Sequence, residues 1–333
     1  MARLSRRDLV KVMGAVGLAG LVRPPTTMAG LLDTLFTSPP RGLTRPITSN
    51  EDFYLTSYRS PPTVRVEEWR LVVKGLVESP LTITYPELIQ RPSTSAIVTL
   101  ECVGNTVGGE FISTAEWKGL SLRGLLEEVK VSPSAYDVVF RAADGYSDGI
   151  RVERAMAGDV LIAHGMNGVP LPQAHGFPAR MIVPGLYGMK SVQWLTEIEV
   201  VGQDFKGYYQ RKGWTDAATV RTTSRIDVPS HGSTVTGPQC VVQGLAFAGT
   251  RGIRQVEISV DEGATWQNAA LEPPLSGSSW VFWRYIWRPM NPGRHTFIVR
   301  ATDGTGLIQI SDEQDPAPDG ASGLHEVTFT VER

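Results

Sequence analysis

The residue whose type and setting most suggest chemistry is Cys102, one of only two cysteines in a chain of 333 residues. It stands in the stretch SAIVTLECVGNTVGGEF (95–111), where an apolar, β-branched run gives way to a Gly/Asn-rich loop. A thiol in this position has three interpretations. It can be a small buried apolar group, a nucleophile paired with His164 or His175, or a thiolate metal ligand.

A lone thiolate does not hold a metal against water, because protein sites normally supply three or four donors. Neither cysteine lies in a CxxC or CxxCH arrangement, which argues against structural zinc, iron–sulfur clusters and covalently attached haem. One thiolate suffices only where a cofactor brings the remaining donors, as a dithiolene-bearing pterin does for molybdenum. A disulfide between Cys102 and Cys240 is a further alternative.

A second group of polar residues follows in AHGFPARMIVPGLYGMKSVQW (174–194). Glycine turns can present backbone N–H groups to an anion, and Arg180 suits the fork geometry that binds phosphate. Taken alone, the stretch is more typical of a plain hairpin. Beside Cys102 it predicts a surface that binds the pterin and its phosphate.

These residues need strands and short helices to position them. In residues 46–204, apolar alternation predicts strands, and Leu122, Leu125, Leu126 and Val129 mark one face of a helix. A short helix is expected around Pro86, and a bulge where the alternation slips by one residue in 190–200. After residue 230 the strand pattern continues without helices, which predicts an immunoglobulin-like β-sandwich. We therefore divide the chain into 1–40 signal and linker, 41–205 catalytic domain, 206–230 linker and 231–333 sandwich.

Composition limits the classes of partner. Hydrophobic residues make up 41% and charged residues 20%, as in ordinary globular proteins. The formal net charge is −2, which gives no reason to expect nucleic acid as a partner.

The first residues predict export. Arg6 and Arg7, followed by Leu9, Lys11 and the short apolar run 12–22, have the form of a twin-arginine signal. An amphipathic N-terminal helix is the alternative, and whether the signal is cleaved stays open. Because this route exports folded proteins, commonly with a cofactor already inserted, the pattern predicts a periplasmic or other extracytoplasmic protein that carries one.

With these motifs in place, the sequence resembles the sulfite oxidase family of molybdopterin enzymes. LECVGN (100–105) is similar to the family's C-x-G-N loop, and AEWKGLSL (115–122) to the segment that follows it. HGFPARMIVPGLYGMKSVQWL (175–195) is the most specific match. VDEGATWQNAAL and WVFWRYIW resemble the family's dimerisation domain, and Tyr146 in DGYSDGI falls where the family places an active-site tyrosine.

The resemblance implies an α+β fold: a mixed α/β molybdopterin-binding domain followed by an immunoglobulin-like sandwich that forms a homodimer. It implies two-electron oxygen-atom transfer, with Cys102 as molybdenum ligand and with Cys102, Tyr146 and Arg284 as catalytic residues. Electrons would pass to a cytochrome c or a membrane electron-transfer subunit. The implied cofactor-binding residues are Cys102, Asn105, His175, Arg180, Gly188, Lys190, Ser191 and Val192.

Two departures from the family concern the substrate. Thr106 stands where sulfite oxidases carry an arginine, and Thr56, Ser57 and Tyr58 stand where they carry Arg-Asn-His. Burying a sulfite dianion without cations costs several kcal/mol. The expected substrate is still a small sulfur oxyanion such as sulfite, with Arg284 preferred over Arg59 and Arg151 as a replacement cation. A reductase of a sulfoxide or another neutral S-oxide or N-oxide, and an exported binding module with a decayed site, are the alternatives.

Overall fold

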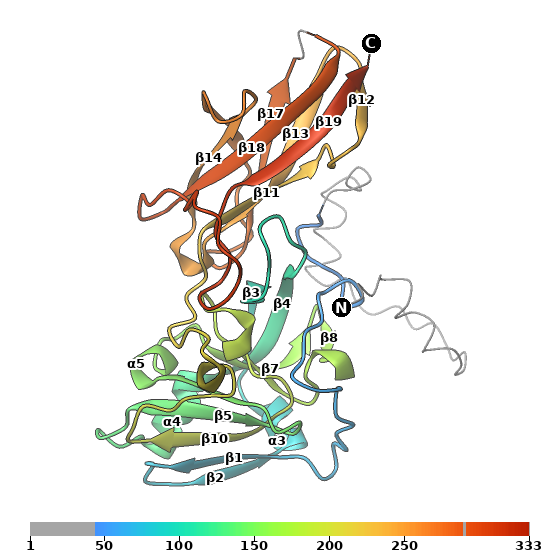
Figure 1. Cartoon of the computed structure of the whole chain (residues 1–333). Helices are drawn as coiled ribbons and strands as arrows, with labels where there is room; N and C mark the ends of the chain where they lie inside the picture. The colour runs from blue at the N-terminus through green and yellow to red at the C-terminus, as the bar shows by residue number, and fades with distance from the viewer. Residues whose placement is uncertain (1–43, 289–290, 333) are drawn as a thin grey trace, which may run out of the picture.

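The computed structural model describes residues 44–288 and 291–332. It shows a mixed α/β domain and a β-sandwich stacked end to end (Figure 1). The predicted twin-arginine signal lies outside the described residues. Within the described ranges, every helix is too short or too polar to cross a lipid bilayer.

The α/β domain contains two sheets. The first has the order β2-β1-β10-β5-β6, in which β1 and β10 are parallel and the other pairs antiparallel. Its strands are β1 (Arg70–Gly75), β2 (Leu81–Thr84), β5 (Asp137–Ala142), β6 (Ser147–Arg151) and β10 (Leu195–Val201). The second sheet has the order β3-β4-β7-β8, with β9 added to β7. Its strands are β3 (Thr94–Glu101), β4 (Ile112–Ser121), β7 (Leu161–Met166), β8 (Val169–Pro170) and β9 (Arg180–Ile182).

Three short α-helices cover this domain, α3 (Tyr85–Gln90), α4 (Leu122–Val129) and α5 (Val152–Ala155). Thr84 caps α3 through the Glu87 amide, the Glu87 carboxylate returns to the Thr84 amide, and Pro86 lies in the first turn. The four predicted apolar residues of α4 are all buried and join the main core. These two helices confirm the sequence prediction, as does the bulge between Leu195 and Glu197.

The sandwich consists of two sheets with the orders β11-β13-β17-β16 and β12-β19-β18-β14-β15. Its strands are β11 (Thr223–Val228), β12 (Thr234–Thr236), β13 (Cys240–Phe247), β14 (Ile253–Ser259), β15 (Gln267–Asn268), β16 (Ala270–Leu271), β17 (Val281–Trp287), β18 (Gly293–Asp303) and β19 (His325–Glu332). Alternate side chains from both sheets, among them Val256, Trp283 and Phe297, form its buried core. The predicted β-sandwich is confirmed.

The sandwich starts earlier than the predicted boundary. Strand β11 falls inside the segment 206–230, which the sequence suggested as a linker, and pairs with β13 over most of its length. The preceding residues 206–222 pack on the α/β domain, where Tyr209 and Val220 contact apolar clusters. The sequence of this segment is rich in charged and small residues, so it does not show which side chains are buried. Their burial depends on partners distant along the chain.

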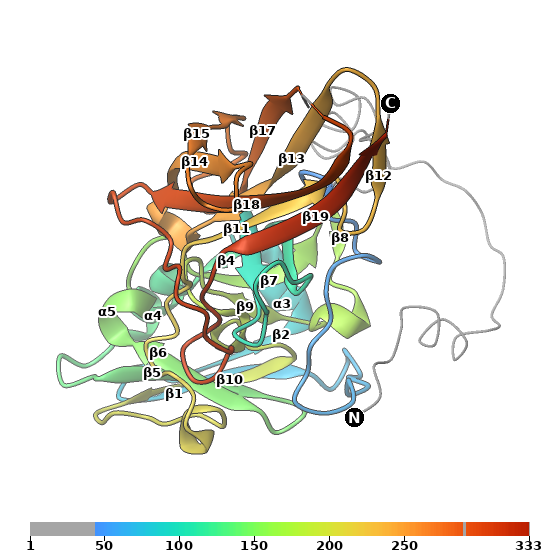
Figure 2. The same cartoon turned by 45° about the horizontal axis from the view of Figure 1, so that its top comes forward.

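The two domains are joined by hydrogen bonds and by apolar contacts. Thr99 on β3 donates its amide to the Ser278 carbonyl at 3.0 Å and accepts the Trp280 amide on its hydroxyl at 2.9 Å. The loop between β18 and β19 also reaches the α/β domain (Figures 1 and 2), where Pro318 O accepts the Thr215 amide at 3.1 Å. A cluster that includes Val103, Met189 and Trp280 fills the junction. The loop carrying Cys102 is therefore supported from behind by the sandwich.

Candidate functional site

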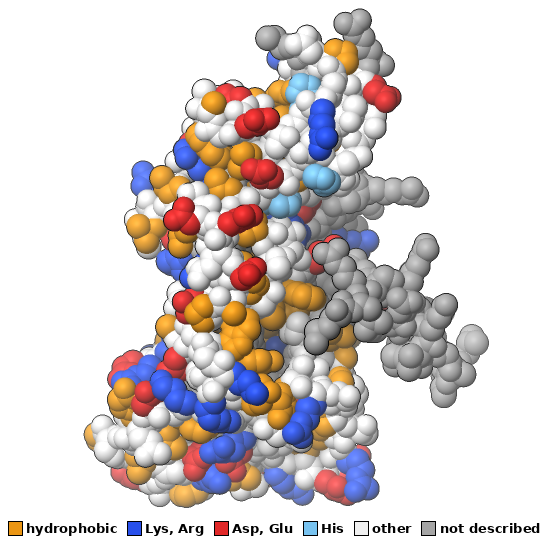
Figure 3. Space-filling model, in the orientation of Figure 1, with side chains coloured by type: hydrophobic (Ala, Val, Ile, Leu, Met, Phe, Trp, Pro, Cys, Tyr) orange, Lys and Arg blue, Asp and Glu red, His pale blue; other side chains and the backbone are white. Residues whose placement is uncertain are grey.

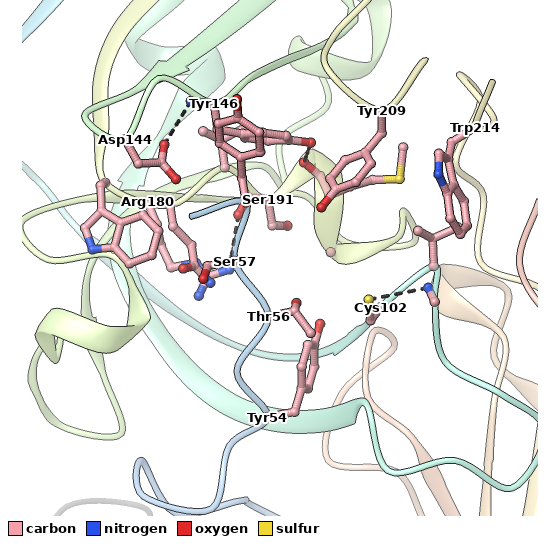
Figure 4. Close-up of a pocket in the computed structure, with 18 of the residues that line it drawn as sticks. Tyr54, Thr56, Ser57, Cys102, Asp144, Tyr146, Arg180, Ser191, Tyr209 and Trp214 are labelled. Carbon is pink, nitrogen blue, oxygen red and sulfur yellow. Dashed lines mark hydrogen bonds between the residues drawn. The ribbon is translucent and has the colours of Figure 1, made fainter. Parts of the chain in front are cut away.

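Cys102 begins the loop that follows β3. Its amide donates to Phe111 O at 2.9 Å, and its carbonyl accepts the Asn105 amide at 2.9 Å, so the backbone around the thiol is fixed on both sides. The Gly104 amide donates to Cys102 Sγ at 3.4 Å. Burial raises the pKa of the Cys102 thiol, while hydrogen bonds from the Gly104 amide and the Thr56 hydroxyl act in the opposite direction. The sulfur faces an open cavity (Figure 4).

This cavity has a volume of about 180 Å³, and seven of its nineteen lining residues are aromatic. Four segments far apart in the sequence contribute to it besides the Cys102 loop. Figure 4 shows Tyr54 and Thr56 from the N-terminal segment near Cys102, with Tyr209 and Trp214 from residues 206–222 across the space. The lining residues are Phe53, Tyr54, Thr56, Ser57, Tyr58, Cys102, Val103, Gly104, Asp144, Tyr146, Arg180, Gly188, Met189, Ser191, Val192, Gln193, Trp194, Tyr209 and Trp214.

Arg180 supplies the positive charge in this wall. It starts β9, its Nη1 donates to His175 O and its Nη2 to Ser191 O, both at 3.1 Å, and its guanidinium lies 5.0 Å from the Trp117 ring centroid. Burial lowers the pKa of Arg180 to about 10. Its Nε has no hydrogen-bond partner. A buried cation on a cavity wall, with one donor left unused, suits an anionic or strongly polar ligand.

Two neighbouring polar atoms are also unpaired. His175 Nε2 is 2.7 Å from Asn50 O, whereas its Nδ1 has no partner. Its ring packs at 5.5 Å from that of Phe53, which lines the cavity. Gln193 Oε1 is buried without a partner on the cavity wall. Burial without compensation costs free energy for each of these groups. Their number around one cavity indicates that a polar ligand completes the wall.

Tyr146 occupies another part of the wall. Its hydroxyl lies 2.9 Å from Asp148 Oδ2 and 3.1 Å from Met189 O. Burial, then the Asp148 charge, raise the pKa of Tyr146 well above its ordinary value. The phenol is therefore protonated across the physiological pH range, and its oxygen can still contact a ligand.

The cavity brings together most, but not all, of the predicted site residues. Cys102, Tyr146, Arg180, Gly188, Ser191 and Val192 line it, and His175 stands just behind the wall. Asn105 does not reach the cavity: its amide Nδ2 donates to Glu101 and its Oδ1 accepts the Phe111 amide, so it closes the loop instead. Lys190 also points elsewhere, because its ammonium binds Asp148 at 2.8 Å and Asp216 at 3.3 Å.

The arginines considered as replacement cations are absent from the cavity wall. Arg284 is exposed on β17, where it pairs across the sheet with Gln243. Arg59 covers the Tyr58 ring, and Arg151 covers the Tyr136 ring and faces Asp137 and Glu153. Within this chain, none of the three lines the cavity described here.

Sequence reasoning missed several lining residues, notably Tyr54, Asp144, Gln193, Tyr209 and Trp214. Tyr209 and Trp214 belong to the segment suggested as a linker. An aromatic pair within a polar segment, as in GYYQRKGW (207–214), is the one signal that could have suggested burial there.

The alternatives for Cys102 lose support from the geometry. Both cysteines are free, so the disulfide with Cys240 is not formed. His164 Nε2 pairs with the Ser93 hydroxyl at 3.0 Å, and His175 Nε2 with Asn50 O. The thiol is only partly buried and faces a cavity, unlike a side chain that merely fills a core.

The donor set fits a metal that is held mainly by a cofactor. Among the described residues, no group of three or more His, Cys, Asp or Glu side chains could hold a metal ion. Cys102 therefore offers one thiolate beside a cavity whose wall carries unpaired polar atoms and one buried cation. A pterin that brings two sulfurs to molybdenum matches both features.

Comparison with known proteins agrees with this geometry. Residues 58–209 match the model of the oxidoreductase molybdopterin binding domain, and residues 215–313 match that of the Mo-co oxidoreductase dimerisation domain. The chain is 31% identical over 318 residues to sulfite oxidase of Gallus gallus, an alignment that covers 79% of this chain and 68% of the relative.

Other relatives extend the comparison. Mitochondrial sulfite oxidase of Rattus norvegicus is 31% identical over 320 residues, covering 81% of this chain and 59% of its own length. The chain thus spans less than two thirds of that relative. An NADH nitrate reductase of Nicotiana tabacum is 29% identical over 293 residues, covering 69% of this chain and 32% of the relative.

The fold has a counterpart among solved structures. The sulfane dehydrogenase SoxCD of Paracoccus pantotrophus superposes with a TM-score of 0.73 at 22% identity, covering 87% of this chain and 85% of the other. At this identity the likeness concerns the fold. Taken with the sequence relatives and the matched domains, it shows that the chain belongs to the sulfite oxidase family of molybdopterin-dependent oxidoreductases, whose cofactor is molybdenum bound to molybdopterin.

Proposed function

We propose that this chain catalyses two-electron oxygen-atom transfer on a small sulfur oxyanion, with sulfite as the first candidate. The observation that carries the proposal is one thiol, Cys102, facing a cavity that is also lined by buried Arg180, whose Nε has no hydrogen-bond partner. In the oxidising direction, sulfite and water give sulfate, two protons and two electrons. The electrons leave through a one-electron carrier.

The bound cofactor supplies the oxygen-atom transfer and accepts the electron pair, and the chain positions it. Cys102 would hold the molybdenum as a thiolate. Arg180, Gln193 and the backbone around Ser191 would bind the polar groups of the pterin, which would satisfy the unpaired atoms. Tyr146 would orient an oxygen of the substrate by its hydroxyl. With the cofactor bound, the aromatic side chains of the wall would limit the entry of water, which would strengthen each of these polar contacts.

A second candidate is reduction of a neutral S-oxide or N-oxide. The observation that favours it is that Arg180 is the sole cation among the described residues that line the cavity, while Asp144 adds a negative charge. Thr106 is exposed in a loop outside the cavity and supplies no charge. A neutral substrate needs no further cations, whereas a dianion does.

A panel of substrates on metal-verified enzyme separates the two candidates. Sulfite with a cytochrome c acceptor and sulfoxides with a reduced dye should be scored on the same preparation, in both directions. We expect turnover of sulfite with a KM that rises with ionic strength, because screening weakens attraction of a dianion. Turnover of sulfoxides alone would contradict the oxyanion proposal and support the second candidate.

The binding-module alternative requires a decayed site, and the geometry gives no sign of decay. Cys102 still faces the cavity, and the Arg180 donor is still unused. Elemental analysis of protein from a host that makes the cofactor should find about one molybdenum per chain. Finding none would contradict an enzymatic role.

The proposed enzyme is a homodimer that passes electrons to a small cytochrome or a membrane subunit. The matched dimerisation domain supports the dimer. So does a cross-strand pair on the sandwich, Val241 and Ile286, whose side chains are 39% and 57% exposed. Ile286→Glu should yield monomers in light scattering at micromolar concentration, whereas an unchanged mass would place the interface elsewhere.

The surface of the α/β domain is consistent with an acidic electron carrier. Figure 3 shows Lys and Arg side chains gathered over this domain on the face in view, while Asp and Glu are more frequent over the sandwich.

The proposed location is the periplasm, reached by the twin-arginine route. Arg6→Lys with Arg7→Lys should retain the protein in the cytoplasmic fraction, and unchanged export would contradict that route.

A further inference from the structure

A line of buried charged groups connects Tyr146 to the surface, and the proposed cofactor site does not use it. The Tyr146 hydroxyl lies 2.9 Å from Asp148 Oδ2. Lys190 Nζ lies 2.8 Å from Asp148 Oδ1 and 3.3 Å from Asp216 Oδ1. The side chains of Asp148 and Lys190 are 1% and 2% exposed, whereas that of Asp216 is 43% exposed. The line therefore starts at the cavity wall and ends in solvent.

The two inner groups are closely packed. The Gly149 amide donates to Asp148 Oδ1 at 2.8 Å, and Lys190 Nζ donates to Gly149 O at 2.9 Å. The segment 207–210 covers the pair: a Cβ at Gly207 would come within 2.9 Å of Asp148 Cα, and Gln210 Nε2 reaches Asp148 Oδ2 at 3.4 Å. A buried ion pair contributes little net stability compared with apolar packing, so stability alone does not explain this arrangement.

Each member of the line can both give and take a proton. A phenol, a carboxyl and an amine all do so, whereas an arginine would hold its proton permanently. Burial raises the pKa of Asp148, with the Lys190 charge opposing it. Such a carboxyl can carry a proton briefly. Other titratable neighbours include Asp144 and Tyr209 beside Tyr146, Asp137 near Lys190, and Lys206 beside Asp216.

We propose that Tyr146, Asp148, Lys190 and Asp216 form a proton-exit path from the cofactor cavity to solvent. The path rests on the proposed function, because oxidation of a substrate with oxygen from water releases two protons for every two electrons taken by a one-electron carrier. Each proton leaves in steps that balance. The Tyr146 O–H bond breaks as an O–H bond forms on Asp148, and Tyr146 recovers a proton from the water-derived group in the cavity.

The outer steps complete the transfer. A Lys190 N–H bond breaks as Asp216 gains a proton, which then passes to bulk water. Lys190 regains its proton from Asp148 after the carboxyl turns to bring the proton to Oδ1. No charge accumulates inside, because every group returns to its starting state.

The chain offers a matched pair of variants to test the path. Asp204 and Asp216 both bind Lys206 Nζ, at 2.8 Å and 2.6 Å, and their side chains are 47% and 43% exposed. Of the two carboxylates, it is Asp216 that binds Lys190, at 3.3 Å. Asp216→Asn interrupts the path, whereas Asp204→Asn removes the same kind of surface charge and leaves the path intact.

The measured quantity is the rate of proton release, and the measurement needs no substrate. Reduced, molybdenum-loaded enzyme is mixed rapidly with ferricyanide in weak buffer containing a pH indicator, and proton release is timed against cofactor oxidation. We expect Asp216→Asn to slow proton release roughly tenfold or more, with recovery in concentrated imidazole, which can accept protons by diffusion. Asp204→Asn should stay within about twofold of the parent. Release from Asp216→Asn at the parent rate would overturn the path.

A second variant guards against a purely structural explanation. Lys190→Arg keeps the positive charge but cannot release its proton, so it should show the same slow release. The thermal unfolding midpoint of each variant shows whether the fold is retained. Absence of molybdenum would overturn the proposed function and the path together. A loaded enzyme that turns over sulfite, yet releases protons normally from Asp216→Asn, would overturn the path alone.

Discussion

The two domains differ in how they treat buried polar groups. Of the seven buried side-chain atoms without a hydrogen-bond partner among the described residues, Trp283 Nε1 is the one that lies in the sandwich. Arg180 Nε, His175 Nδ1 and Gln193 Oε1 belong to the cavity wall or stand directly behind it. In the sandwich, buried Asp303 is instead bound by Arg251, Thr305 and backbone amides.

We interpret this contrast as the difference between an α/β domain whose cavity binds a ligand and a sandwich whose interior is filled by its own side chains. An unpaired buried polar atom is costly, so a group of them around one cavity indicates that the partner is a bound molecule. The sandwich buries Val256, Phe297 and Phe329 in an apolar core and needs no ligand to be complete. Matched substitutions in the two domains should therefore have different consequences.

The largest expected effect is the difference in turnover between Ser variants of the two cysteines. Cys102→Ser should reduce turnover by about a thousandfold or more, because a neutral hydroxyl replaces the thiolate ligand. Cys240→Ser, at a buried position of β13, should leave turnover per folded molecule unchanged. Molybdenum content, turnover and thermal unfolding check both variants, and an active Cys102→Ser enzyme would remove the basis of the site.

Replacing each of two buried phenylalanines by alanine should separate effects on the free energy of unfolding from effects on cofactor retention. Phe297→Ala in the sandwich core should lower the free energy of unfolding by about 3–5 kcal/mol, with normal molybdenum content in the folded fraction. Phe53→Ala should lose both stability and molybdenum, since this ring lines the cavity. Denaturant titration and metal analysis distinguish these outcomes. Equal molybdenum loss in both variants would contradict the contrast between the domains.

His325 tests the junction between the domains. Its Nδ1 accepts the Ile226 amide at 3.0 Å, and its ring lies against Gly108 of the α/β domain, where a Cβ would clash at 2.2 Å. Burial, then repulsion from Arg225, lower the pKa of His325 to about 4, against weaker attraction from Asp227. The neutral ring is therefore the folded form.

Because this folded-state pKa lies below the unfolded value, the unfolded chain binds the proton first as pH falls. The contribution is fully present above about pH 6.5 and is lost between that pH and about pH 4. It amounts to roughly 3 kcal/mol at most. Unfolding free energies measured across this range should fall in the parent and fall less in His325→Gln. Parallel curves would contradict the assigned burial.

The smallest expected effect compares buried Arg180 with partly buried Arg251. Arg180→Gln removes the cation from the cavity and should weaken cofactor retention by about 1.5–3 kcal/mol, or roughly tenfold to a hundredfold. Arg251→Gln breaks the 2.8 Å ion pair with Asp303 and should lower stability without loss of molybdenum. Cofactor release followed by absorbance after dilution measures the first effect, and equal retention in both variants would argue against Arg180 as a cofactor ligand.

The amino-acid sequence by itself determined the family and the fold class, and it singled out Cys102 as the candidate metal ligand. Cys102 and the stretch 174–194 carry local chemistry that needs no neighbour to be recognised, and apolar alternation in β14, β18 and β19 follows from the two-residue period of a strand. Only the tertiary structure decided which side chains share the cavity. Tyr54, Tyr209 and Trp214 come from segments without a motif, and their contacts depend on chain packing across long separations.

Packing between distant segments also explains why the sequence did not reveal the surroundings of two basic residues, Lys190 and Arg284. Lys190 stands within the stretch 174–194 that is predicted to bind the cofactor, yet it binds Asp148 and Asp216. Burying an ammonium requires carboxylates, and these lie elsewhere in the sequence. Arg284 alternates with buried Trp283 on β17 and is left facing solvent. Periodicity fixes which face of a strand a residue occupies, but only the packed domains determine what that face meets.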